Sequence, residues 1–137
     1  MALTKKQQLT ALLQSGIDSY RAGRLDQAID GLVRNAKNFA NAPKLWGYLG
    51  FLYAEAGQDA KAIGAFSKAV TLSPHSEQAS LGLFHSLWRT GRTNAAFDEM
   101  RRFASSNDSP RYRALLRDML AEPPREPTAH AEVLVLA

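Results

Sequence analysis

The sequence predicts an all-α protein, a right-handed α-solenoid of three helix pairs followed by a C-terminal capping helix. Glycines and alanines recur at intervals of 34 residues, the glycines at Gly23, Gly57 and Gly91 and the alanines at Ala28, Ala62 and Ala96. A fixed period of this length is typical of stacked helical arrays, in which each repeat is one helix pair. Apolar residues follow helical spacing along most of the chain and strand signals are sparse, which favours the same architecture.

The recurrent residues have a physical role in such a pair. Glycine ends the first helix at the lowest cost, because it has no Cβ to oppose a left-handed backbone. Alanine is expected where the two helices approach most closely, since a larger side chain there would force them apart.

The central repeat carries a motif of seven residues, which are Trp46, Leu49, Gly50, Tyr53, Ala62, Phe66 and Pro74. The first four lie at i, i+3, i+4 and i+7, on one face of a helix. The motif resembles the tetratricopeptide pattern W-x2-L-G-x2-Y…A-x3-F…P at every position. The resemblance implies a small tetratricopeptide module of bacterial type with three repeats, and such arrays usually bind another protein.

The repeats are expected at about 9–42, 43–76 and 77–110. The outer two follow the motif less closely: the first has Ser15 and Ser19 where Leu and Tyr are usual, and the third has Phe84 where Gly or Ala is usual. Such departures are typical of terminal repeats, because one side of each faces something other than a repeat.

Helix boundaries follow from capping residues and prolines. Thr4 and Gln7 have the spacing of a capping box at the start of the first helix, and Pro43 suits the first turn of the third. Ser76 and Thr93 are the expected N-caps of the fifth and sixth helices. The expected helix ranges are about 4–22, 25–38, 43–56, 59–72, 76–90, 93–105 and 110–122.

The last helix is expected to close the array. Ser109 can cap it, and Pro110 suits its first position. Its apolar stripe consists of Tyr112, Leu115, Leu116, Met119 and Leu120.

The composition changes after residue 122, where prolines punctuate a polar stretch and the last residues, Val133-Leu134-Val135-Leu136-Ala137, are apolar. We therefore divide the chain into a tetratricopeptide repeat domain, residues 1–122, and a proline-rich flexible tail with an apolar end, residues 123–137. The apolar end is either a frayed terminus or a segment that docks in a groove. If that groove belonged to a neighbouring molecule, the tail would promote self-association.

Composition excludes several classes of protein. The 137 residues are enough for one domain, and the absence of cysteine rules out a disulfide and a thiolate metal site. The opening lacks the apolar region of a signal peptide, and no apolar run approaches the ~20 residues of a membrane span. These features favour a cytoplasmic protein without a membrane partner.

The sequence contains no phosphate-binding glycine loop, no zinc-binding helix motif and no nucleophile elbow. His75, His85 and His130 include no pair spaced as metal ligands on one helix face. Asp98 and Glu99 are adjacent and do not face each other on a helix, so a solvated face is expected for them. We therefore expect a non-enzyme with no cofactor and no bound metal.

In the tetratricopeptide family the first helices of successive repeats line a concave groove, so the resemblance assigns groove positions in this chain. The assigned residues are Leu13, Ile17, Tyr20, Arg21, Lys44, Tyr48, Phe51, Leu81, His85, Trp88 and Arg89. Most are apolar or aromatic, their three basic members would form a rim, and Gly47 and Gly82 would leave room. Aromatic residues in such a patch are the usual hot spots of binding. The alternative is that some of these side chains pack against one another or against the last helix or tail.

One function of the family is not expected. Members that grip the acidic tails of heat-shock chaperones need Lys, Asn and Arg at five groove positions. This chain has other residues at all five, which are Leu13, Ile17, Tyr48, Gln78 and Gly82.

An apolar groove instead suits an amphipathic helix or an extended segment with apolar anchors. Small arrays of three repeats resemble bacterial chaperones of the type III secretion class, which hold an apolar segment of a secreted protein. We therefore expect an adaptor or chaperone that binds another protein or a peptide segment. The alternative is an immunity protein that binds and neutralises a toxin, since some small immunity proteins use this fold.

The rival class is nucleic-acid binding. The formal net charge is +4 and the pI about 9.6, and five arginines lie close in sequence, at Arg101, Arg102, Arg111, Arg113 and Arg117. A basic patch of this kind would bind phosphates or attract an acidic protein. The net charge is modest for the length, so nucleic acid is the weaker expectation.

Overall fold

The computed structural model describes residues 2–121, and the predictions for the tail lie outside these residues. The chain forms α1 (Lys5–Arg21), α2 (Leu25–Asn35), the 3-10 helix η1 (Ala36–Phe39), α3 (Pro43–Glu55), α4 (Asp59–Leu72), α5 (Glu77–Arg89), α6 (Thr93–Ala104) and α7 (Pro110–Ala121). No strand occurs in this part of the chain. The predicted all-α class is confirmed.

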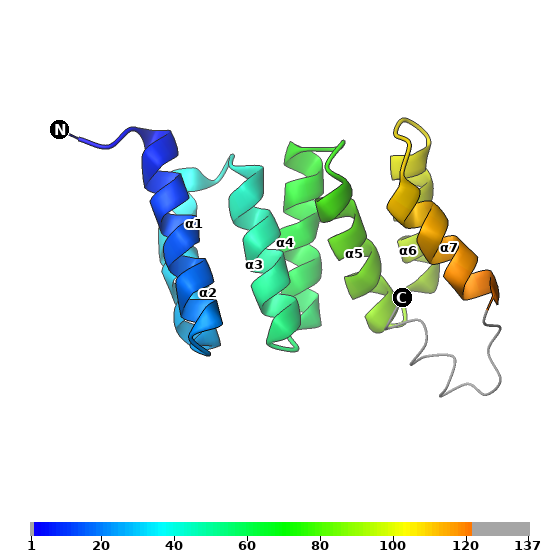
Figure 1. The fold of residues 1–137 in the computed structure, drawn as a ribbon, viewed down its shortest axis with the longest axis horizontal. Helices are drawn as coiled ribbons and strands as arrows, with labels where there is room; N and C mark the ends of the chain where they lie inside the picture. The colour runs from blue at the N-terminus through cyan, green and yellow to red at the C-terminus, as the bar shows by residue number, and fades with distance from the viewer. Residues whose placement is uncertain (1, 122–137) are drawn as a thin grey trace.

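The helices stack side by side in two layers (Figure 1). In that view α1, α3, α5 and α7 form the front layer, and α2, α4 and α6 lie behind them. Closely packed pairs are α1 with α2, α3 with α4 and α5 with α6, and α4 also packs against α5. This arrangement confirms the predicted solenoid of consecutive helix pairs.

The turn inside each pair is built in the same way three times. Gly23, Gly57 and Gly91 have φ angles of 79°, 74° and 79°, in the left-handed region. After each glycine, the next backbone N–H donates to the carbonyl five residues earlier. These bonds are Arg24 to Ser19 at 2.8 Å, Gln58 to Tyr53 at 2.8 Å and Arg92 to Leu87 at 2.9 Å. They close the last turn of the first helix in the manner of a Schellman motif, which confirms why glycine recurs.

Most of the expected helix starts are also confirmed. The Thr4 hydroxyl accepts from the Gln7 N–H at 3.1 Å, and the Gln7 side chain accepts from the Thr4 N–H at 2.9 Å. Ser76 accepts from the Ala79 N–H at 3.2 Å, and Ser109 accepts from the Tyr112 N–H at 3.1 Å.

The prediction that Thr93 caps α6 is wrong, since Arg92 is the N-cap and Thr93 is the first helical residue. The turn at Gly91 explains the shift, because Arg92 both closes α5 through its N–H and opens α6 through its carbonyl. That carbonyl accepts from the Ala96 N–H at 3.0 Å.

The second helix is shorter than the expected 25–38. It ends at Asn35, whose side-chain amide donates to the Gly31 carbonyl at 2.8 Å, and the chain tightens into η1. Local side-chain bonds of Asn to the backbone compete with helix continuation. The tighter turn carries Phe39 into the core.

The apolar core has two clusters, one around the first helix pairs and one around the last. Leu32, Leu45 and Leu49 belong to the first, and Phe84 and Phe103 to the second. Trp46 and Tyr53 of the central motif contact both clusters, so the central repeat joins the two halves of the array. The recurrent alanines are buried in these clusters, as expected for close helix approach.

The last helix covers the second cluster with part of its predicted stripe. Tyr112 and Leu115 are buried and Met119 packs against the cluster. Leu116 is 37% exposed and Leu120 is 80% exposed, so these two members of the stripe are left open to solvent.

A buried polar cluster fastens α7 to the array. Ser80 donates to Glu99 Oε2 at 2.6 Å, and its hydroxyl lies 2.7 Å from the Tyr112 hydroxyl. Arg102 donates from Nε to Glu99 Oε1 at 2.8 Å. Glu99 is only 8% exposed, so the expected solvated face is wrong for Glu99, because its carboxylate accepts from Ser80 of α5 and pairs with Arg102 of α6. Burial raises the pKa of Tyr112 to about 12, which keeps its phenol protonated.

Candidate functional site

The predicted groove residues come from α1, α3 and α5, the helices of the front layer. Five of them surround one small hollow between α1 and α3; they are Leu13, Ile17, Tyr20, Tyr48 and Phe51. Gly16, Leu32 and Leu52 complete its wall, and these three were missed at the sequence level. Leu32 could have been found from the period, since it follows Ala28 by four residues and therefore shares its helix face.

The hollow has a volume of about 30 Å³, and its exposed wall consists of apolar atoms. The hollow is therefore small and suits a methyl group or the tip of an aliphatic side chain. The hollow exposes no polar atom, so a water molecule in it finds no hydrogen-bond partner in the wall.

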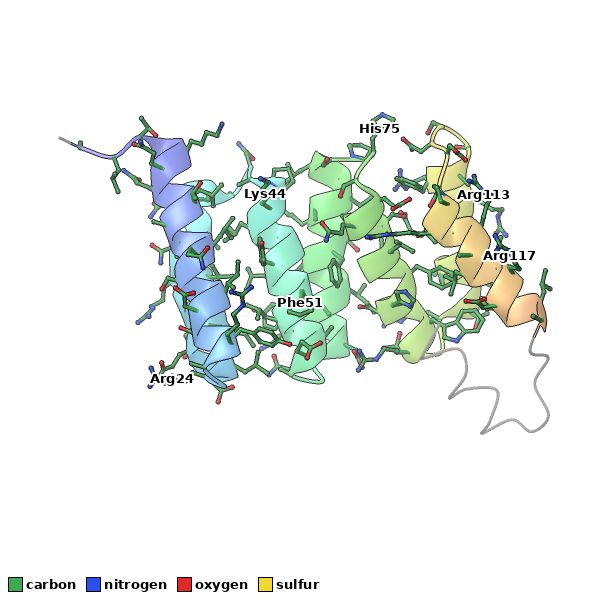
Figure 2. The ribbon with its side chains drawn as sticks, in the orientation of Figure 1. Arg24, Lys44, Phe51, His75, Arg113 and Arg117 are labelled. Carbon is green, nitrogen blue, oxygen red and sulfur yellow. The ribbon has the colours of Figure 1, made fainter. Side chains whose placement is uncertain are left out.

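Phe51 is the most prominent side chain at this site. It is 41% exposed, although most large apolar side chains of the array are buried. Figure 2 shows it on the lower half of α3, on the viewer's side of the array. An exposed aromatic ring beside an apolar hollow offers surface that binding could remove from water.

Tyr20 holds α1 to α3 beside Phe51. The two rings meet edge to face, with centroids 5.3 Å apart and planes at 76°. The Tyr20 hydroxyl donates to Glu55 Oε2 at 3.2 Å. Loss of hydration and the hydrogen bond to Glu55 raise the pKa of Tyr20. Contacts between α1 and α3 therefore hold the aromatic rings of Tyr20 and Phe51 in place beside the hollow.

The rest of the α3 face is open. A Cβ added at Gly47 would meet nothing within 4 Å, so this glycine does leave room, as expected. Lys44 is exposed near the start of α3 (Figure 2), and Arg21 is exposed at the end of α1. These two cations border the face at opposite ends of their helices.

The predicted groove residues of α5 have other contacts. Trp88 stacks on Phe84 at 5.8 Å between centroids and meets Phe97 edge to face at 5.3 Å. Leu81 packs against the same core cluster, and Arg89 forms an ion pair with Asp59 at 3.5 Å. The structure therefore does not bring the α5 residues to the hollow, and the packing alternative describes them better.

His85 lies half-buried on α5 beside Phe84, with ring centroids 5.6 Å apart. Burial, and then the charge of Arg89, lower the pKa of His85 below its ordinary value. The imidazole is therefore neutral at pH 7.

Gly82 has a different role from the expected one of leaving room in the groove. A Cβ at this position would lie 2.3 Å from Phe66 Cε1, which is far inside van der Waals contact. Gly50 borders the same ring, since its Cβ would lie 2.7 Å from Phe66 Cδ1. The two glycines let α3 and α5 close on either side of Phe66, so Gly82 serves helix packing.

The arginine cluster is largely neutralised. Arg101 pairs with Asp98, Arg102 with Glu99, Arg111 with Glu77 and Arg113 with Asp108. Arg117 is the one member without an ion pair among residues 2–121. A patch in which each of four cations has its own carboxylate has little net field, which weakens the case for phosphate binding.

Within the described part of the chain, no group of three or more His, Asp or Glu residues could hold a metal ion. No helix there is long and apolar enough to cross a membrane.

Comparison with known proteins agrees with the geometry of the central pair. A family model of the tetratricopeptide repeat matches residues 43–76, which contain α3 and α4. The chain is a tetratricopeptide repeat protein. No curated protein matches it. Tetratricopeptide repeats are non-catalytic, and they generally mediate binding to other proteins or peptides.

Proposed function

We propose that this tetratricopeptide protein binds an apolar segment of a partner protein in the groove between α1 and α3. The observation that carries the proposal is the hollow whose wall includes Leu13, Ile17, Tyr20, Tyr48 and Phe51. The adjacent exposed ring of Phe51 would supply the main contact outside the hollow.

The size and polarity of the site define the partner's chemistry. An aliphatic side chain such as Val, Ile or Leu would insert its tip into the hollow, while the neighbouring residue of the partner covered Phe51. Full burial of one such side chain contributes about 1.5–3 kcal/mol. Because the apolar wall is short, a single turn of helix or a few extended residues would fill it.

The protein would act as an adaptor or as a chaperone of the type III secretion kind, which holds an apolar segment of its client. The alternative is an immunity protein that neutralises a toxin. The state of the partner separates the two, since a chaperone binds an exposed segment of an unfolded client and an immunity protein binds a folded toxin. Nucleic-acid binding is disfavoured because four of the five clustered arginines are paired with carboxylates.

Site-specific photo-crosslinking in the source cell tests this proposal. A benzophenone analogue of phenylalanine replaces Phe51 in one variant, and in the control it replaces Val33, which is exposed on α2 outside the groove. The proposal expects one discrete adduct from position 51, with the attachment point in an apolar stretch of the partner. No adduct from position 51, or the same adduct from both positions, would refute it.

A further inference from the structure

The outward side of α7 is an apolar helix face without a partner in the described part of the chain. Leu116 and Leu120 lie one turn apart there, and Leu120 has the largest exposed fraction of any large apolar side chain among residues 2–121, at 80%. We call these two residues the open face of α7. Two exposed leucines one turn apart on the same helix form a small apolar surface, and covering it would remove apolar area from water.

The position of Leu116 in the repeat shows what kind of contact is missing. Tyr112, Leu115, Leu116 and Met119 have the i, i+3, i+4, i+7 spacing of the motif on the earlier first helices, and Leu116 is the third member. In each earlier pair the third member meets an apolar side chain of the second helix. A Cβ at Gly16 would lie 3.6 Å from Leu32, a Cβ at Gly50 would lie 2.7 Å from Phe66, and the rings of Phe84 and Phe97 lie 5.9 Å apart.

The last helix therefore begins a fourth pair whose second member is not among residues 2–121. The inward side of α7 already has partners. Tyr112 and Leu115 pack in the second core cluster, and the Tyr112 hydroxyl is hydrogen-bonded to Ser80. Leu116 and Leu120 are the exposed apolar residues of α7 against which a second element would pack.

We propose that the apolar segment Val133-Leu134-Val135-Leu136 of the same molecule covers the open face of α7. The tether has a suitable length. Residues 122–132 separate Ala121 from Val133 and span up to about 36 Å at ~3.3 Å per extended residue. The 12 residues of α7 are about 18 Å long, so the segment can reach every turn of the helix.

Tethering also favours this occupant over others. A segment on a short linker is present at an effective concentration in the millimolar range, and this value falls as the span increases. The open face adjoins the start of the tail, because Leu120 precedes the last residue of α7. The hollow between α1 and α3 lies at the other end of the array (Figure 1), so the tail meets α7 first.

The charged residues beside the open face of α7 are opposite in sign to most of those that flank the apolar segment. Arg113 and Arg117 lie on the outer side of α7, away from the other helices (Figure 2). Glu132 directly precedes Val133, and the linker holds two more glutamates against one arginine. Arg117 has no ion pair among residues 2–121, so its guanidinium is available to the carboxylate of Glu132 when the apolar residues pack.

The absence of cysteine from the chain allows a direct test, since one introduced thiol takes a spin label at a single place. Ala137→Cys carries the nitroxide next to the apolar segment and leaves the segment unchanged. Amide signals of the folded full-length protein are then compared with the label oxidised and reduced. The proposal expects loss of the amide signals around Leu116 and Leu120, and full signals around Tyr20 and Phe51.

A second variant separates docking from simple proximity along the tether. Leu134→Asp with Leu136→Asp, in the labelled protein, should restore the signals around Leu116 and Leu120. Unchanged signal loss in this variant would show that the linker alone brings the label near α7, and the proposal would be overturned. Signal loss around Tyr20 and Phe51 would place the tail in the α1–α3 groove instead. A mixed sample contains isotope-labelled protein without nitroxide and nitroxide-labelled protein without isotope. Signal loss around Leu116 and Leu120 in that sample would assign the contact to a second copy, and the proposal would be overturned.

Discussion

Replacing Gly82 with alanine tests the packing at the centre of the array. The new Cβ would lie 2.3 Å, 2.5 Å and 2.7 Å from Cε1, Cζ and Cδ1 of Phe66. The ring has little room to move away, because the backbone of Gly50 also approaches it so closely that an added Cβ there would lie 2.7 Å from Cδ1. The helices must therefore separate, or the ring must leave its rotamer.

The expected magnitude combines two opposing effects. Overpacking of a core costs about 1–3 kcal/mol, and the confinement of Phe66 from both sides favours the upper part of that range. Alanine in place of glycine inside a helix stabilises by about 1 kcal/mol. The net loss for Gly82→Ala is therefore about 2 kcal/mol, which lowers the Tm by roughly 8 °C at ~4 °C per kcal/mol.

The assay is reversible thermal and urea unfolding followed by far-UV circular dichroism. Gly64→Ala is the matched control, because a Cβ there meets nothing within 4 Å and should raise the Tm. Phe66→Leu in the Gly82→Ala background should recover part of the loss, since the smaller side chain relieves the clash. If Gly82→Ala were as stable as Gly64→Ala, the close packing of the Phe66 ring between Gly50 and Gly82 would be disproved.

Three further predictions concern stability. Ala62→Leu should cost roughly 1–3 kcal/mol by overpacking the central pair, and a Tm equal to that of the wild type would contradict close approach at this alanine. Tyr112→Phe should cost about 1 kcal/mol by removing the hydroxyl that meets Ser80, as measured by urea unfolding, and a neutral result would show that the bond adds nothing. The pKa of His85 is lower in the folded protein than the ordinary value near 6.5. The unfolded state therefore binds the proton more readily, and the contribution of His85 to stability is present above about pH 6.5 and declines as the pH falls below it. In His85→Gln this part of the pH dependence should disappear from unfolding curves, and an unchanged dependence would assign it to other groups.

The fold could be predicted well from the sequence because its signals are local and repeated. Gly23, Gly57 and Gly91 each occupy a left-handed turn position that other residues adopt at a cost, so the period appears directly in the sequence. The misplaced cap at Thr93 has a physical cause, since the turn at Gly91 already determines where α6 begins. The early end of α2 likewise depends on one side-chain bond of Asn35, which competes with the helix.

The candidate site could be predicted only in part. Family positions identify which side chains lie on the front helices. They do not show which of these side chains pack against neighbouring residues and are therefore not free to bind a partner. Trp88 occupies a groove position by register and yet stacks within the core, because Phe84 replaces the small residue usual in the motif and brings an aromatic partner. Glu99 was misjudged for a similar reason, since its partner Ser80 lies 19 residues away in sequence.

The central claim is that the α1–α3 groove binds an apolar segment of a partner. Its most direct test is the Kd of the crosslinked partner segment, measured by calorimetry for Phe51→Ala, Tyr48→Ala and the control Val33→Ala. We expect a loss of roughly 2 kcal/mol, about 30-fold, for each groove variant, with the fold retained and no change for Val33→Ala. An unchanged Kd in the folded double variant of Tyr48 and Phe51 would contradict the account.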